Sequence, residues 1–139
     1  MDVILHEKNK YVIRFDRGEE LLQKLVGFCK KNKISSGFFY GLGATQELEL
    51  SWYDLARKEY KNKKIKKNLE IISLIGNISY LKKEIIIHAH GGFADNYLNL
   101  IAGHIKKLVV SATCEVFLEV FNNKVDREYS EDIGLNLLK

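Results

Sequence analysis

The sequence predicts an α+β fold, a mostly antiparallel sheet with one main helix packed on it, and three observations carry this prediction. Runs rich in aromatic and β-branched residues, such as 11–15, 69–80 and 84–90, are typical of strands. Short turns rather than helices separate most of these runs, which disfavours a parallel sheet of the Rossmann type. One segment alone, about residues 18–32, carries apolar residues at helical spacing. The length of 139 residues is that of a single domain, 1–139.

The helix is the clearest element. Asp16 stands three residues before Glu19, as in a capping box, and is the expected N-cap. Lys30 and Lys31 suit the C-terminal end of a helix, where cations are favoured. The apolar positions at helical spacing are Leu21, Leu22, Leu25, Val26 and Cys29.

The remaining segments read mainly as strands and turns. Residues 35–44 resemble a buried strand interrupted by glycines, and residues 47–53 and 112–121 alternate like half-buried strands. We expect a glycine-containing turn region over 91–103. The tail, 133–138, is too apolar to be free, and we expect it to pack on the core.

Composition excludes several classes of protein. Hydrophobic residues make up 46% and charged residues 29% of the chain, as in ordinary soluble proteins. No apolar run approaches the roughly 20 residues of a membrane helix, and the first residues do not resemble a secretory signal. We therefore expect a cytoplasmic protein without membrane contact. Cys29 and Cys114 form no paired motif and read as buried thiols.

Positive charge is concentrated in one segment, residues 57–67, which we expect to form an exposed hairpin or loop. It contains one acid and seven basic residues: Arg57, Lys58, Lys61, Lys63, Lys64, Lys66 and Lys67. Three interpretations stay open for it: a solvated loop, a contact with duplex DNA through phosphate neutralisation, or a contact with an acidic protein. Tyr60 is its only aromatic residue, which gives stacking on single strands little support.

Histidines carry the strongest chemical signal. Three of the four in the chain fall between positions 88 and 104. His88 and His90 stand two apart on an expected strand, so both side chains point to the same face. His104 follows Gly103, where the chain could turn back and supply a third nitrogen. Three imidazoles with a fourth position open suit zinc of the catalytic type, and structural histidines are the alternative.

Other motifs give weaker evidence for a function. Gly41-Leu42-Gly43 begins like a phosphate-binding loop, but Gln46 replaces the third glycine and no helical pattern follows, so close packing is the better interpretation. No serine lies in a nucleophile-elbow pattern. Glu70 and Glu115 are acids within apolar strands, and each is either exposed at an edge or a candidate general base.

Taken in order, these landmarks resemble the plants-and-prokaryotes conserved (PPC) domain over about residues 11–138. The motifs are Gly18-Glu19, Gly41-Leu42-Gly43-Ala44, Glu70-Ile71-Ile72-Ser73-Leu74-Ile75-Gly76, His88-Ala89-His90, Gly103-His104 and Thr113-Cys114-Glu115. Ala102 replaces the first glycine of the family's Gly-Gly-His. The absence of proline excludes the AT-hook with which plant members read the minor groove.

The resemblance implies a homotrimer, a DNA-binding regulatory role and, on His88, His90 and His104, a zinc site. Apolar residues on both faces of one strand, Phe117 and Phe121 opposite Val116 and Val120, also favour assembly. Two alternatives stay open. One is an enzyme in which the metal activates water, with Glu70 or Glu115 as the base. The other is a trimeric interaction module whose histidines are structural.

Overall fold

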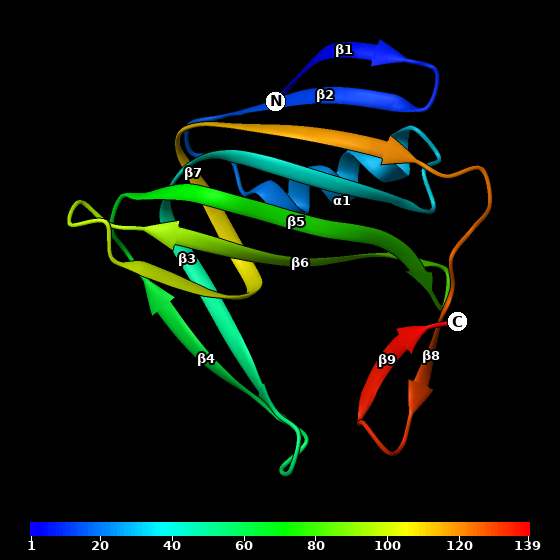
Figure 1. Ribbon diagram of the computed structural model, residues 1–139. Coiled ribbons are helices and arrows are strands. Elements are labelled where there is room, and N and C mark those ends of the chain that lie inside the picture. Colours follow the sequence, from blue (N-terminus) through cyan, green and yellow to red (C-terminus); the bar gives the residue numbers. More distant parts are fainter.

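Seven antiparallel strands form the main sheet of the computed structural model, which describes residues 1–139 (Figure 1). Their order is β1-β2-β7-β6-β5-β3-β4, and a further pairing of β3 with β7 closes β3, β5, β6 and β7 into a ring. The strands are β1 (Asp2–Glu7), β2 (Lys10–Asp16), β3 (Gly37–Asp54), β4 (Glu59–Ile65), β5 (Leu69–Leu81), β6 (Glu84–Ala94) and β7 (Leu100–Val120). The mostly antiparallel α+β prediction is confirmed.

The two long strands make this closure possible. The C-terminal half of β7 pairs with β2 and with the first half of β3, whereas its N-terminal half pairs with β6 and with the second half of β3. Gly43, at a φ of +149°, lies where the register of β3 shifts against both neighbours. A side chain there would meet the backbone of Thr113 and Cys114, so the glycines around Leu42 do serve close packing.

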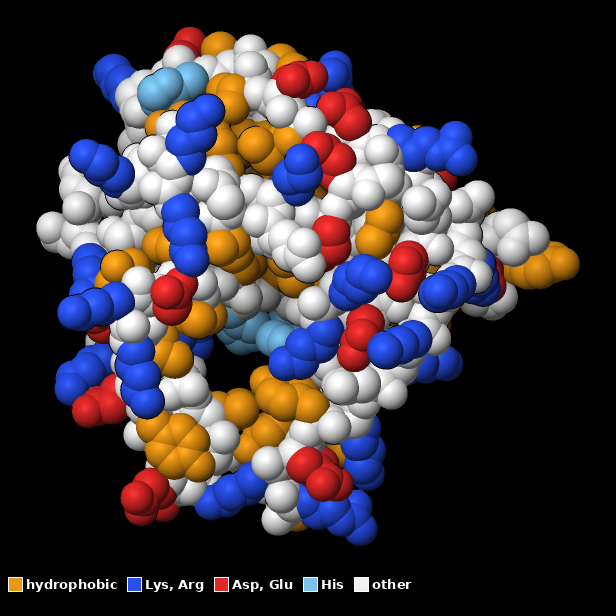
Figure 2. All heavy atoms as spheres, turned by 180° about the vertical axis from the view of Figure 1, so that it is seen from behind, with side chains coloured by type: hydrophobic (Ala, Val, Ile, Leu, Met, Phe, Trp, Pro, Cys, Tyr) orange, Lys and Arg blue, Asp and Glu red, His pale blue; other side chains and the backbone are white.

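Two arms extend from the closed part of the sheet. One is the hairpin of β3 and β4; the other is a separate hairpin of β8 (Arg127–Ser130) and β9 (Leu135–Leu138). The arms meet at their tips, where the Tyr53 hydroxyl donates to the carbonyl of Ile133 at 2.6 Å and the Lys58 ammonium donates to the carbonyl of Glu131. Between them the surface is hollowed, and histidine side chains are visible inside the hollow (Figure 2).

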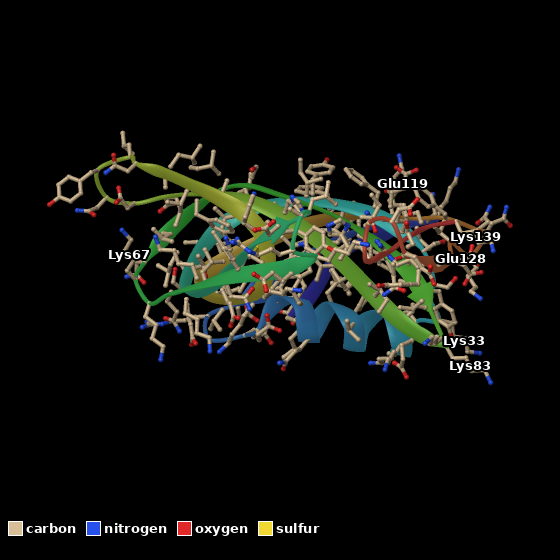
Figure 3. The ribbon with its side chains drawn as sticks, turned by 90° about the horizontal axis from the view of Figure 1, so that it is seen from below. Lys33, Lys67, Lys83, Glu119, Glu128 and Lys139 are labelled. Atoms are coloured by element: carbon tan, nitrogen blue, oxygen red, sulfur yellow. The ribbon has the colours of Figure 1, made fainter.

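The helix α1 (Leu21–Lys31) covers one side of the sheet and packs on β6 and β7 (Figure 3). Its buried residues are Leu21, Leu25, Phe28 and Cys29, and they join a core of 22 buried side chains. Both cysteines are buried free thiols, and burial raises the pKa of each to about 12. The interpretation of both as inert thiols therefore agrees with the structure.

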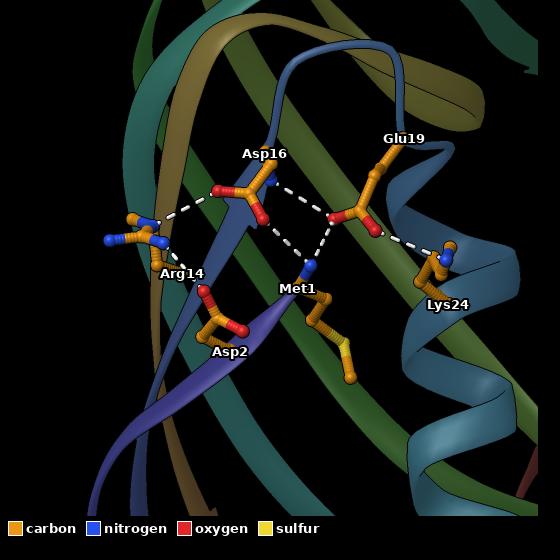
Figure 4. A network of polar contacts seen from close by, with 6 residues as sticks. All are labelled: Met1, Asp2, Arg14, Asp16, Glu19 and Lys24. Carbon is orange, nitrogen blue, oxygen red and sulfur yellow. Dashed lines mark hydrogen bonds and ion pairs between the residues drawn. The ribbon is translucent and has the colours of Figure 1, made fainter.

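The start of the helix differs from the prediction. Glu20, not Asp16, is the N-cap: its carboxylate accepts from the backbone N–H groups of Leu22, at 3.3 Å, and Gln23, at 2.7 Å. Glu19 still reaches back to the N–H of Asp16 at 3.0 Å (Figure 4). That contact closes a turn ahead of the helix, so the capping-box spacing was real but placed the helix start too early.

Three other expectations need correction. The expected turn over 91–103 is mostly strand, because β6 continues to Ala94 and β7 begins at Leu100. Residues 35–53, read as two strands, form most of the single strand β3, and β1 was not foreseen. The apolar tail does not enter the core but forms the largely exposed hairpin of β8 and β9. By contrast, the basic segment agrees with the expected exposed hairpin, since most of it is the edge strand β4, which pairs with β3.

A substitution at Gly76 tests the packing inside the closed ring of strands. A side chain on it would meet the ring of Phe39 and the carbonyl of His88 at 2.7 Å, whereas nothing lies within 4 Å of the corresponding position on the helical Gly27. We expect Gly76→Ala to lower the free energy of unfolding by about 1–3 kcal/mol through overpacking. Gly27→Ala should raise it by up to about 1 kcal/mol. Chemical denaturation measures both, and equal stabilities would contradict this packing.

Candidate metal centre

Strand pairing brings the three histidines together. His88 and His90 lie two apart on β6 and therefore share a face, and His90 stands opposite His104 in the antiparallel pair of β6 and β7. The paired residues run from Ala94 opposite Leu100 to His90 opposite His104, and end there. His104 is thus placed by strand register, without the turn at Gly103 that the sequence suggested.

The imidazoles form a compact cluster. One ring nitrogen from each lies within 4.8 Å of the other two, and the Nε2 atoms of His88 and His90 are 3.1 Å apart. Their ring centroids lie 5.0–5.3 Å from one another. His90 is exposed and the other two are half-buried, so the cluster is reachable from solvent.

Charge at the cluster favours neutral imidazoles. Burial, followed by the positive charge of Lys106, lowers the pKa of His104 to about 4. Burial also lowers the pKa of His88, with smaller effects of His90, Arg127 and Lys106. A neutral imidazole has a free lone pair, which is the form that binds a metal ion.

The cluster fits a tetrahedral metal ion. Two imidazole nitrogens on zinc stand about 3.3 Å apart when each Zn–N bond is about 2.0 Å long. The observed separation of 3.1 Å between His88 and His90 is close to this value, and a nitrogen of His104 lies within 4.8 Å of both. Three such ligands leave a fourth position for water or another molecule.

A cavity of about 330 Å³ opens beside the cluster, where β6 and β7 separate beyond the paired histidines. The hollow in Figure 2 shows basic and apolar side chains around the histidines. Its lining comes from β4, β5, β6, β7 and the hairpin of β8 and β9, and consists of Tyr60, Leu81, Ile86, Ile87, His88, His104, Lys106, Arg127, Leu135, Asn136 and Leu137.

Sequence reasoning missed two cations of this cavity. Lys106 follows His104 by two positions on β7, so its place on the same face could have been inferred; its ammonium lies 4.1 Å from the ring centre of Tyr60. Arg127 comes from β8, and no signal in the sequence connects it with the histidines. Its guanidinium donates to the Ser79 hydroxyl at 2.6 Å and to the Asn77 side chain at 3.0 Å.

The two candidate bases lie elsewhere. Glu70 is five residues along β5 from Ile75, the residue opposite His90, which is roughly 17 Å of strand. Glu115 pairs with Arg14 and Leu42 on the other half of β7. Both glutamates are exposed, and the cavity lining contains neither.

The basic segment forms no single positive face. Along β4, Lys61 and Lys63 alternate with Tyr60 and Lys64, so their side chains leave opposite faces. Acids partner several of these cations: Asp54 contacts Arg57 and Lys61, Glu49 contacts Lys64, and Asp95 contacts Lys67, with N–O distances of 3.1–3.9 Å. Lys67 lies at the opposite end of the molecule from Glu128 and Lys139 of the second hairpin (Figure 3).

Comparison with known proteins agrees with this architecture. The sequence profile of the Plants and Prokaryotes Conserved domain, abbreviated PCC or PPC, matches residues 5–122. The chain belongs to this family. The PPC protein of Pyrococcus horikoshii is 31% identical over 100% of this chain and 97% of its own, with a TM-score of 0.88. The family resemblance inferred from the motifs is thereby confirmed.

Two further solved structures are similar. A candidate DNA-binding protein from Bacteroides thetaiotaomicron is 30% identical over 97% of this chain and 94% of its own, with a TM-score of 0.93. A metal-containing protein from Archaeoglobus fulgidus is 26% identical over 100% of this chain and 99% of its own, with a TM-score of 0.89. No curated protein matches the sequence. The family profile ends at residue 122 of this PPC chain, so the cavity wall formed by Arg127 and by residues 135–137 lies outside the matched region.

The lowered pKa of His104 can be measured directly. In metal-free protein we expect this imidazole to stay neutral as the pH falls through 6.5 and to take up its proton only near pH 4. Lys106→Met should raise the pKa, because it removes a positive charge that opposes protonation. An NMR titration of the imidazole resonances measures both values. An unshifted His104, or no response to Lys106→Met, would contradict these electrostatics.

Proposed function

We propose that this PPC-domain protein binds one zinc-like ion per chain through His88, His90 and His104. The observation that carries the proposal is the convergence of three ligand nitrogens within 4.8 Å, on two strands whose register fixes their positions. The low pKa values of His88 and His104 support it, since both imidazoles are neutral at physiological pH. The relative from Archaeoglobus fulgidus contains a metal, which adds weight.

The chain's own residues define what the centre would do. A zinc ion with three imidazole ligands acts as a Lewis acid toward whatever occupies its fourth position. His104 and His88 form part of the cavity wall, so that position would face the open cavity that Tyr60 and Lys106 also line. The lining contains no carboxylate, so the enzyme alternative gains a pocket but not the acid that a general-base mechanism requires.

Metal analysis tests the centre. Protein purified without chelators and without an affinity tag should contain about one equivalent of zinc or a similar ion per chain. His88→Ala combined with His104→Ala should remove it, because only one ligand would remain. His6→Ala is the matched control, since that imidazole stacks on Tyr11 at 4.1 Å and should not affect metal content. Equal metal in all three proteins, or none in the wild type after incubation with zinc, would refute the centre.

A second role, contact with duplex DNA, is supported by the DNA-binding description of the Bacteroides thetaiotaomicron relative and by the lysines of β4. We propose that any such contact is electrostatic and indifferent to sequence, because lysines act as point charges toward phosphates. Acids that pair with Arg57, Lys61, Lys64 and Lys67 reduce the charge available for it.

Binding to duplex DNA should therefore be weak and steeply dependent on salt. If about five phosphates are neutralised, the logarithm of affinity should fall against the logarithm of salt with a slope of about −4.5. Reversal of Lys63, Lys64, Lys66 and Lys67 to glutamate should abolish binding in a fluorescence-anisotropy titration. Equal binding by the reversed protein, or none by wild type at low salt, would remove this role.

We also propose that the protein is a homotrimer. Cross-strand partners Phe117, Tyr40 and Ile75 form a row on the outer face of the sheet that ends at His90, and Tyr40 and Ile75 are more than half exposed. The exposed apolar residues of this face are Phe38, Tyr40, Leu42, Ile75 and Phe117. Apolar surface of this continuity usually marks an interface, and it adjoins the metal centre. A cytoplasmic location stays a prediction.

Light scattering tests the assembly. Wild type at micromolar concentration should have three times the chain mass, and Tyr40→Glu combined with Ile75→Glu should dissociate it, because two charges would be buried at the interface. Trp52→Glu is the control, since Trp52 is 61% exposed but lies beside Lys61, away from this row. A monomeric wild type would contradict the proposal.

A further inference from the structure

The cavity beside the histidines is unusual in its charge. Its ionisable lining consists of imidazoles, Tyr60, Lys106 and Arg127, with no carboxylate among them. Neither Lys106 nor Arg127 forms an ion pair anywhere in the structure. Lys106 is exposed, whereas Arg127 is half-buried, and a half-buried charge is normally paired. The unpaired Arg127, with Lys106 beside it on the lining, therefore gives the cavity a net positive charge that suits an anion.

We propose that this cavity binds a small organic anion, with a carboxylate or phosphate head held by Lys106 and Arg127 and a short aliphatic tail against the apolar wall. The proposal rests in part on the metal centre, because a bound cation would strengthen the attraction for the anion. The two basic residues provide the site even without metal.

Arg127 is positioned for this role by the fold. Three of its five N–H donors are spent on neutral acceptors: the Ser79 hydroxyl, the Asn77 side chain and the carbonyl of Asn136, at 2.6–3.0 Å. These contacts hold the guanidinium rigidly at the cavity wall and leave two donors free. Partial burial lowers its pKa, which agrees with a charge that lacks an acidic neighbour.

Lys106 supplies the second charge, and its neighbour shows the contrast. The ammonium of Lys107, the next residue, pairs with Glu47 at 2.8 Å. Lys106 instead lies over the ring of Tyr60, whose own ring centre is 5.3 Å from that of His104. A cation–π contact leaves the ammonium free to bind an anion, because the ring adds no formal charge.

The aliphatic part of the cavity lining favours a short aliphatic tail on the ligand. Five aliphatic side chains, contributed by β5, β6 and β9, complete the wall: Leu81, Ile86, Ile87, Leu135 and Leu137. The volume of about 330 Å³ is at the lower end for small-molecule sites, which run from roughly 300 to 1,000 Å³. The volume and chemistry therefore fit an anion with a few aliphatic carbons.

Isothermal titration calorimetry on the full chain tests the proposal with three probes of similar shape. Isovalerate carries the carboxylate head, isobutyl phosphate carries the phosphate head, and isovaleramide is the neutral control. We expect one or both anions to bind metal-free protein, and zinc-loaded protein more tightly, while the amide does not bind. The preferred anion identifies the head group.

Two variants locate the binding. Lys106→Met should weaken binding of the preferred anion roughly tenfold or more, as loss of a hydrogen bond to a charged group does. Lys63→Met, which removes one charge from the far face of β4, should leave affinity unchanged. Circular dichroism checks that both variants fold. Arg127→Gln gives only supporting evidence, because the substitution also removes contacts that hold β8 in place.

The outcomes separate this proposal from the metal centre. If the wild-type protein cannot hold zinc but still binds the anion, and Lys106→Met weakens that binding, the metal centre would be refuted and the anion site supported. Zinc binding with no measurable affinity for either anion would overturn the anion site alone. Equal affinity for the amide and the anions, or no effect of Lys106→Met, would also overturn it.

Discussion

The register in which His90 stands opposite His104 is the constraint on which the candidate site depends. A slip of one residue between β6 and β7 would turn one of the two imidazoles to the core face and destroy the cluster. The slip is opposed from the other side, because β7 is also paired with β3, where His104 stands opposite Ser51. A site built on two doubly paired strands is held more rigidly than one built on loops.

The same geometry creates the space beside the histidines. β6 and β7 separate beyond His90 and His104, and the hairpin of β8 and β9 lines one side of the resulting cavity. That hairpin is attached at its base and at its tip: the backbone N–H of Tyr80 donates to the carbonyl of Val125, and the hydroxyl of Tyr53 donates to the carbonyl of Ile133. These contacts fix the hairpin, and with it one wall of the cavity, against β5 and against the arm of β3 and β4.

Much of this could be predicted from the sequence, and the reasons are local. Alternation along 84–90 placed His88 and His90 on one face, and the single stretch of helical spacing found α1. The rest depended on distant pairing. Glycines in 91–103 indicated a turn, yet Gly91 and Gly103 pair with each other inside the sheet. Arg127 enters the site through contacts with Asn77 and Ser79, some fifty positions earlier, which no local pattern reveals.

X-ray absorption spectroscopy of the zinc-loaded protein is the sharpest test of the metal centre, because it identifies the ligands from the metal itself. We expect three imidazole nitrogens at about 2.0 Å with one further light-atom ligand, and no sulfur, since Cys29 and Cys114 are buried. A spectrum with six oxygen ligands, with sulfur, or with a single imidazole would show that His88, His90 and His104 do not form the metal centre.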